Sequence, residues 1–247
     1  MTSNVLSIGP RLIRPGSLPI IAGILATALL AAALGWAARD AQAGASAPRA
    51  FDGFRQVRMK TVQAQLDQVT GPYIVVMGDS HAERLYLPTL CGLPVVNAGM
   101  SGATVADVLA LARQITPPRQ AEALLLSVGT NDIWIKHRPE SEQAVSGFKA
   151  GLAALSQRLG VWTKRRLLVA IPPVDDKEEA MFPRQAAGRY SGMLARACRP
   201  QGCLYRDLFG SALPARAFSD GVHLRDYARF IRSQEADLCR DLGLARP

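Results

Sequence analysis

The sequence lacks the signatures of several common kinds of binding site. None of its four cysteines forms a Cys-x-x-Cys pair, and its three histidines are scattered, so no metal site is expected. The stretch Gly99–Thr104 has neither the Gly-Lys-[Ser/Thr] of a P-loop nor the third glycine of a dinucleotide fingerprint. No segment repeats at the period of a solenoid. We therefore expect a chain that works without a metal or another cofactor.

Acidic residues are also in short supply. There are 20 of them against 29 basic residues, which gives a net charge of +9 at pH 7. The basic residues form no dense block and accompany no nucleic-acid-binding motif, so no nucleic-acid partner is expected. Such a surface would favour anionic neighbours, or would simply be solvated. Aromatic residues amount to 6%, with no lipid-binding stripe beyond the N-terminal segment.

Residues 1–43 are predicted to be a targeting or anchoring segment. Two arginines precede an uncharged stretch, and its apolar part, residues 18–38, would as a helix match a hydrocarbon core of about 30 Å. Ala41-Gln42-Ala43 also fits a cleavage site of the A-x-A type. We expect either an uncleaved signal anchor in the membrane or a signal peptide cleaved after Ala43. In both cases the remainder is exported to the cell envelope, on the periplasmic or extracellular side.

The four cysteines fit an oxidising compartment. Cys198 and Cys203 bracket Arg-Pro-Gln-Gly, whose proline and glycine favour a turn, so we expect these two to form a short-loop disulfide. That pairing leaves Cys91 with Cys239. Four cysteines allow three pairings, and four free thiols are the alternative.

Short apolar runs alternate with helical patterns after residue 69. A linker and lead-in helix are predicted over residues 44–69, and the domain itself over residues 70–247. Runs that are apolar throughout are typical of parallel strands buried on both faces. The pattern predicts an α/β fold, a doubly wound three-layer α/β/α sandwich with a mostly parallel five-stranded sheet. The expected strands are 73–77, 93–96, 123–128, 167–171 and, more weakly, 203–205; the expected helices are 81–87, 104–115, 141–159, 183–197 and 224–242.

Four short motifs carry residues with chemical potential. Three of them follow the first three apolar runs, and active sites of such sheets form beyond the carboxyl ends of the strands. The fourth places an aspartate three residues before a histidine. In chain order the motifs are Gly78-Asp79-Ser80, Asn97-Ala98-Gly99, Gly129-Thr130-Asn131-Asp132 and Asp220-Gly221-Val222-His223.

These residue types are those of nucleophilic acyl transfer. A serine hydroxyl needs a base to take its proton, so Ser80 is the candidate nucleophile and His223 its base, oriented by Asp220. The backbone N–H groups of Ser80 and Gly99 and the side-chain amide of Asn131 are the candidate oxyanion donors. Taken singly, each would read as a helix cap or turn residue; together they predict a catalytic site.

The four motifs resemble those of the SGNH (GDSL-like) hydrolases, over roughly Tyr73 to Leu242. The resemblance implies Ser80 as nucleophile, Gly99 and Asn131 as oxyanion donors, and His223 with Asp220 as base and orienter. It departs from the name-giving motif at His81, where that motif has leucine. His81 either points into the site or simply begins a helix.

We therefore expect an exported serine esterase that hydrolyses short-chain or O-acetyl esters through an acyl-enzyme on Ser80. Small esters or acylated carbohydrates would be its substrates. Trp134 and His137, in the loop after Asn131, would overhang the site as a substrate loop, or belong to an ordinary loop. Two other functions remain open: an O-acyltransferase acting on envelope polysaccharide with the same triad, and a non-catalytic envelope binding module.

Overall fold

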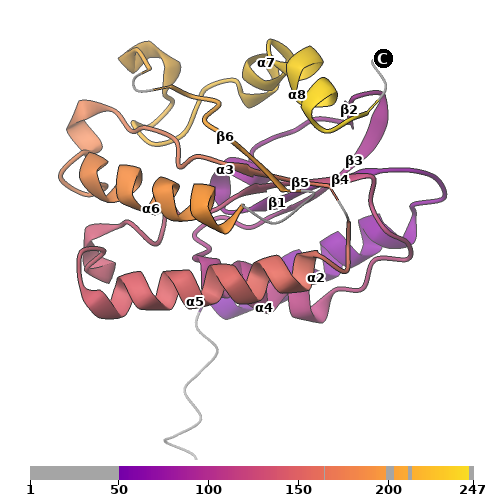
Figure 1. The fold of residues 1–247 in the computed structure, drawn as a ribbon, viewed down its shortest axis with the longest axis horizontal. Helices are drawn as coiled ribbons and strands as arrows, with labels where there is room; N and C mark the ends of the chain where they lie inside the picture. The colour runs from indigo at the N-terminus through magenta and orange to yellow at the C-terminus, as the bar shows by residue number, and fades with distance from the viewer. Residues whose placement is uncertain (1–49, 164, 199–202, 211–212, 245–247) are drawn as a thin grey trace, which may run out of the picture. The chain divides into compact units, whose positions relative to one another are not determined.

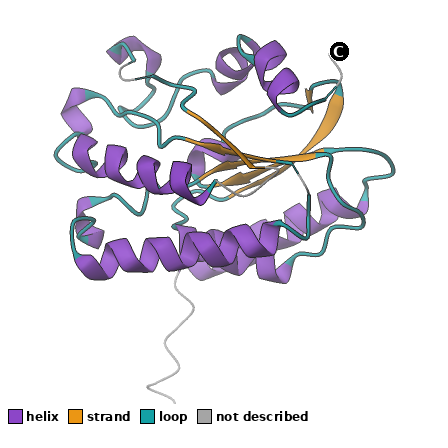
Figure 2. Cartoon of the chain, viewed as in Figure 1, coloured by secondary structure: helices purple, strands orange, loops and turns teal. Residues whose placement is uncertain are grey.

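A six-stranded sheet organises the chain, in the strand order β2-β3-β1-β4-β5-β6 (Figures 1 and 2). The computed structural model describes residues 50–163, 165–198, 203–210 and 213–244, so the predicted segment 1–43 lies outside it. Five strands run parallel, and β2 pairs with β3 in the antiparallel sense. The strands are β1 (Ile74–Gly78), β2 (Thr89–Leu90), β3 (Leu93–Gly99), β4 (Ala123–Ser127), β5 (Arg166–Val169) and β6 (Cys203–Arg206).

The predicted strand number was one too low. The additional strand, β2, has only two residues at the edge of the sheet, too few for an apolar pattern to reveal. The five parallel strands lie where the apolar runs predict them, and the α/β sandwich is confirmed.

Helices cover both faces of this sheet. They are α2 (Ala50–Asp67), α3 (Ser80–Glu83), α4 (Val105–Gln114), α5 (Glu142–Leu159), α6 (Arg184–Ala197), α7 (Tyr227–Arg232) and α8 (Glu235–Asp241). Among the described residues, short 3₁₀ turns lie in the loops after β4, β5 and β6: η1 (Ile135–His137), η2 (Asp176–Glu178) and η3 (Ala215–Ala217). None of the helices described is both long and apolar enough to cross a membrane.

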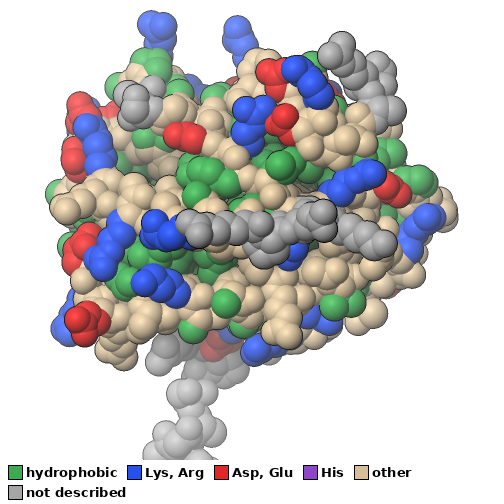
Figure 3. All heavy atoms as spheres, in the orientation of Figure 1, with side chains coloured by type: hydrophobic (Ala, Val, Ile, Leu, Met, Phe, Trp, Pro, Cys, Tyr) green, Lys and Arg blue, Asp and Glu red, His purple; other side chains and the backbone are tan. Residues whose placement is uncertain are grey.

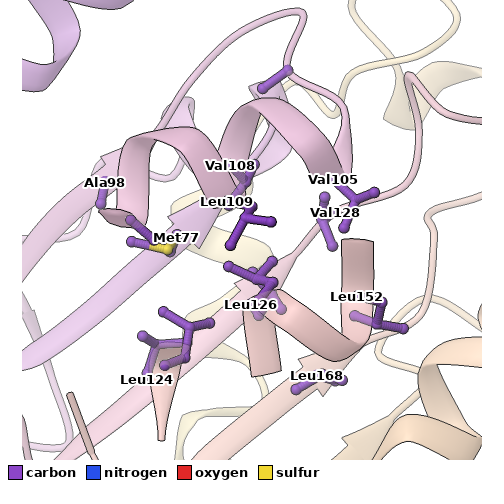
Figure 4. Packing of buried hydrophobic residues seen from close by; sticks show 14 of the residues in the cluster. Met77, Ala98, Val105, Val108, Leu109, Leu124, Leu126, Val128, Leu152 and Leu168 are labelled. Atoms are coloured by element: carbon purple, nitrogen blue, oxygen red, sulfur yellow. The ribbon is translucent and has the colours of Figure 1, made fainter. Parts of the chain in front are cut away.

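Alternate residues of each strand enter different cores. Val75 and Met77 of β1 pack with residues of α2, α4, α5 and α6, whereas Ile74 and Val76 pack with residues of α3, α7 and α8. Figure 4 shows the first core, with Met77, Leu124 and Leu126 lying among side chains of the covering helices. This division produces the three predicted layers.

Two disulfides have the predicted pairing. Cys91 bonds to Cys239, across 148 residues, and ties the turn between β2 and β3 to α8. Cys198 bonds to Cys203, across 5 residues, between the end of α6 and the start of β6. The first bond therefore fixes a distant pair of elements, and the second closes only a short loop.

Candidate active site

Ser80 lies at the turn between β1 and α3. Gly78 ends the strand with a φ of +148°, and a Cβ there would fall 1.7 Å from the Ser127 carbonyl oxygen, so only glycine fits. Asp79 caps α3 by accepting the His81 N–H at 3.0 Å. Its other carboxylate oxygen accepts the Thr130 N–H at 3.3 Å. The turn that presents Ser80 is thus tied to the loop after β4.

The predicted nucleophile, base and orienter come together although 143 residues separate the first two. The Ser80 Oγ lies 2.7 Å from His223 Nε2, and His223 Nδ1 lies 2.8 Å from Asp220 Oδ2. Asp220 Oδ1 accepts the backbone N–H groups of Val222 and His223, at 3.1 and 2.8 Å. With His223 neutral, Nδ1–H donates to Asp220 and Nε2 accepts from Ser80, the arrangement a general base requires.

Burial is the main factor that favours this protonation state of His223. Burial lowers the pKa of His223 below its ordinary value; the Asp220 carboxylate opposes the shift and Arg84 adds to it. Burial alone would raise the pKa of Asp220, but hydrogen bonds from His223 and Val222 hold it well below its usual range. At neutral pH the site therefore contains an ionised Asp220 and a neutral His223.

Arg84 is a neighbour of the triad that sequence reasoning missed. Its guanidinium NH1 lies 3.3 Å from Asp220 Oδ2, the same oxygen that His223 Nδ1 contacts. Both side chains are partly exposed, 40% for Arg84 and 46% for Asp220. Arg84 follows Ser80 by four residues, at the end of α3. This closeness to the nucleophile was the one feature of the sequence that could have suggested Arg84. Nothing in the sequence predicted its contact with Asp220.

Two of the three predicted oxyanion donors remain available. The Ser80 N–H makes no hydrogen bond with any residue that the structure describes. Asn131 Nδ2 donates to the Ala103 carbonyl at 3.0 Å, which occupies one of its two N–H groups.

The third predicted donor, Gly99, has a different task. Its N–H donates to Asn97 Oδ1 at 3.0 Å. A Cβ at Gly99 would lie 2.0 Å from the Glu83 nitrogen, so this glycine lets β3 approach α3. The engaged amide counts against Gly99 as an oxyanion donor.

Gly102, three residues later, is a better candidate. It has a φ of +75° in the loop between β3 and α4, and its N–H makes no hydrogen bond within the described part of the chain. It directly precedes Ala103, whose carbonyl Asn131 contacts. Sequence reasoning singled out this glycine only to exclude a phosphate loop.

Asn97 and Arg58 hold the strands and helix of the site together. Asn97 Nδ2 donates to the carbonyls of Ala82, Glu83 and Leu85 at 2.9 to 3.2 Å and so satisfies the end of α3. Arg58 of α2 donates to the Asn97 carbonyl and to Asn97 Oδ1, both at 2.9 Å, and to the Gly99 carbonyl. Arg58 was not predicted, because only the fold shows that α2 reaches the end of β3.

Asp132 and the side chains after it brace the Asn131 loop. Asp132 accepts the Val105 N–H at 3.0 Å at the start of α4, and burial raises its pKa to about 7, as it does that of Asp79. His137 Nδ1 lies 2.7 Å from the Asn131 carbonyl oxygen. The Trp134 ring lies against Phe182 and 3.2 Å below Lys136 Nζ. The substrate role of Trp134 and His137 stays a prediction.

No curated protein matches this chain. Among solved structures, a candidate platelet activating factor from Streptococcus pneumonia superposes with a TM-score of 0.63 at 20% identity, covering 75% of this chain and 93% of its own. The acetylxylan esterase Axe2 from Geobacillus stearothermophilus gives 0.54 at 18% identity, covering 71% and 97%.

A third similar structure is LAE5, an alpha/beta hydrolase enzyme from the metagenome of Lake Arreo, Spain. It gives a TM-score of 0.54 at 18% identity and covers 72% of this chain and 97% of its own. These similarities show a shared fold. The model of the GDSL-like lipase/acylhydrolase family matches residues 61–228, which include every residue of the triad. The chain therefore belongs to the GDSL-like lipase/acylhydrolase family.

Proposed function

We propose that this protein is an exported serine esterase that removes short acyl groups through an acyl-enzyme on Ser80. The observation that carries the proposal is the continuous hydrogen-bonded series from Ser80 Oγ through the His223 imidazole to the Asp220 carboxylate. A binding module has no need of a base held 2.7 Å from a serine hydroxyl.

The geometry supports the following reaction. His223 Nε2 takes the hydroxyl proton of Ser80 while the Ser80 Oγ forms a bond to the ester carbonyl carbon. The C–O bond to the alcohol then breaks, and His223 returns the proton to the leaving oxygen. Water next gives a proton to His223 and attacks the acyl group, and the proton goes back to Ser80 as the acid leaves. Asp220 stays ionised throughout and stabilises the imidazolium.

The tetrahedral oxyanion would be held by three N–H donors. We assign these to the Ser80 backbone, the free N–H of the Asn131 side chain and the Gly102 backbone. The unused hydrogen-bonding capacity of each supports the assignment. Gly99 is left out because its amide is engaged by Asn97.

Acylated carbohydrate is the substrate class we favour. One similar structure is an acetylxylan esterase, and its catalytic mutants replace a serine, an aspartate and a histidine. The aspartate stands three positions before the histidine, as Asp220 does before His223.

The proposal of export is supported by the charge-free stretch 18–38 and by two disulfides, which persist in oxidising compartments. Lys and Arg side chains are spread over the face seen in Figure 3, with no single basic block on it.

Labelling with a fluorophosphonate tests the proposal, because this reagent reacts with an activated serine whatever the natural ester. The full chain should gain one adduct by intact mass, and Ser80→Ala should gain none. Hydrolysis of 4-nitrophenyl acetate by the wild type should be lost once Ser80 carries the adduct. A folded protein that takes no adduct would contradict the proposal.

A further inference from the structure

The histidine beside the nucleophile is buried and bonded to a distant tyrosine. His81 follows Ser80 in α3 and is 3% exposed. Its Nδ1 lies 2.6 Å from the Tyr227 hydroxyl, which belongs to α7, 146 residues further along the chain. Neither side chain takes part in the proton transfers described above. His81 lies in the first turn of α3, which begins at Ser80, and its buried ring faces that of His223 in the loop of the base.

The same hydroxyl holds the backbone next to His223. The Leu224 N–H donates to the Tyr227 oxygen at 3.2 Å, so the hydroxyl proton is free to be donated to His81 Nδ1. On the other side, the His223 carbonyl accepts the Ser219 N–H at 2.8 Å. The peptide segment that carries the base is therefore fixed from both sides, once by its own turn and once by Tyr227.

When the Tyr227 hydroxyl donates to Nδ1, a neutral His81 carries its own proton on Nε2. Burial lowers the pKa of His81 to about 3, and the neighbouring His223, whose ring centre is 5.2 Å away, adds to the shift. The buried Nε2 has no hydrogen-bond partner among the described residues. The bond at Nδ1 is therefore the described contact through which His81 can act.

His81 does not line a cavity that could bind a substrate. The cavity beside the ring has a volume of about 20 Å³ and is lined mainly by apolar side chains, among them Leu125, Val169 and Phe209. A space of that size holds no organic ligand.

We propose that His81 and Tyr227 form a positioning clamp, which joins the helix of the nucleophile to the loop of the general base and holds His223 at hydrogen-bonding distance from Ser80. The inference rests on the proposed function. Neither residue touches the reacting atoms. The clamp acts through Leu224 and so through the orientation of His223. A misplacement of the base by a fraction of an ångström slows the chemical step and leaves substrate binding nearly unchanged.

Tyr227→Phe removes the hydroxyl and with it both bonds of the clamp. We expect kcat for 4-nitrophenyl acetate to fall about tenfold with KM within about twofold, and fluorophosphonate labelling to slow by the same factor as kcat. Tyr86→Phe is the matched control, because Tyr86 is 78% exposed near the end of α3. It should behave as the wild type. The melting temperature is measured for each variant, so that a loss of folded protein is separated from a slower reaction.

His81 variants test the clamp independently of Tyr227. His81→Leu removes the acceptor, whereas His81→Asn keeps an oxygen acceptor close to the position of Nδ1. We expect the leucine variant to lose activity as Tyr227→Phe does and the asparagine variant to recover most of it. Combining His81→Leu with Tyr227→Phe should lower kcat no further than the tyrosine change alone, because both remove the same link.

Three results would overturn the clamp: an unchanged kcat in Tyr227→Phe, additive losses in the double variant, or an asparagine variant no better than leucine. Each would be read against a wild type that is labelled at Ser80. If the wild type itself takes no label, the proposed function fails. If it is labelled and the variants react at its rate, only the clamp fails.

Discussion

Asn131 is the residue whose proposed role in the transition state is easiest to isolate. One N–H of its side-chain amide holds the Ala103 carbonyl, and the other is free to meet the oxyanion. Removal of one such donor typically raises the barrier by about 3 kcal/mol. Asn131→Ala should therefore lower kcat roughly a hundredfold or more for 4-nitrophenyl acetate. Near-normal turnover would remove Asn131 from the oxyanion hole.

Arg84 should contribute to the pH at which the activity begins to fall on the acid side. Its charge adds to the low pKa of His223, whose first cause is burial, and the base must be neutral to act. In Arg84→Gln the protonated imidazole is less disfavoured, so the pKa of His223 rises. The acid limb of kcat/KM should move to higher pH by on the order of half a unit, since a partly exposed charge is screened.

Arg225→Gln is the control for this pH profile. Arg225 is exposed and lies in the same loop as His223, two residues further on, where its Nε donates to the Arg216 carbonyl. Arg225→Gln removes the same charge as Arg84→Gln but leaves the contacts of Asp220 unchanged. A shift of equal size in both variants would show a general effect of net charge and no special role for Arg84.

The sequence pointed to the candidate catalytic groups but not to the residues that hold them in place through contacts. Ser80, Asp220 and His223 stand in short motifs whose spacing has a chemical meaning. Arg58 and Arg84 look like ordinary surface arginines, and the contacts of Arg58 with Asn97 and Gly99 and of Arg84 with Asp220 exist only once the chain has folded. Gly99 was assigned a donor role because its Asn97 partner was not foreseen.

Helices were predicted less accurately than strands where side chains interrupt them. The pattern favours a helix over residues 81–87, yet α3 ends at Glu83 because Asn97 takes the carbonyls that a longer helix would use. The predicted helix 224–242 is divided into α7 and α8, and Ser233 at the break donates its hydroxyl to the Phe230 carbonyl. The parallel strands were predicted more accurately because strands buried on both faces are apolar throughout, and this composition is visible in the sequence.

The two disulfides should contribute different amounts to stability, because one joins distant elements and the other closes a short loop. Removal of Cys91–Cys239 with two alanines frees α8 from the β2–β3 turn and opens a loop of 148 residues. The loop-entropy relation gives about 5 kcal/mol for that bond and about 2 kcal/mol for the 5-residue loop of Cys198–Cys203. Urea unfolding of the two double variants should rank them in this order. The reverse ranking would contradict the entropic explanation.

In the whole molecule, Asp79 and Asp132 each contribute a stability that falls as the pH rises from acid toward 8, whereas the lowered pKa of His81 acts in the opposite sense at acid pH. Burial raises the pKa of Asp79 and of Asp132 to about 7, so the folded state holds protons that the unfolded state releases at lower pH. The stabilisation is complete below the ordinary aspartate range and is lost as the pH passes 7. A shift of this size corresponds to a loss on the order of 4 kcal/mol for each group.

Asp132→Asn tests this dependence. Asparagine keeps an acceptor for the Val105 N–H but does not titrate, so the unfolding free energy at pH 8, relative to that at pH 4.5, should be higher than in the wild type. Asp176→Asn, at a side chain 88% exposed, serves as the matched control. An equal slope in wild type and Asp132→Asn would contradict the assignment.

The Cys91–Cys239 bond also bears on how the protein survives proteases. Ser80 precedes the first cysteine and His223 precedes the second, so a cut in any exposed loop between Cys91 and His223 leaves the two fragments covalently joined. Outside the reducing cytosol, a nicked molecule would keep its serine and its histidine on one particle, held further by the shared sheet. Such a molecule would migrate as one band on a gel without reductant and as two bands with it, while retaining its activity.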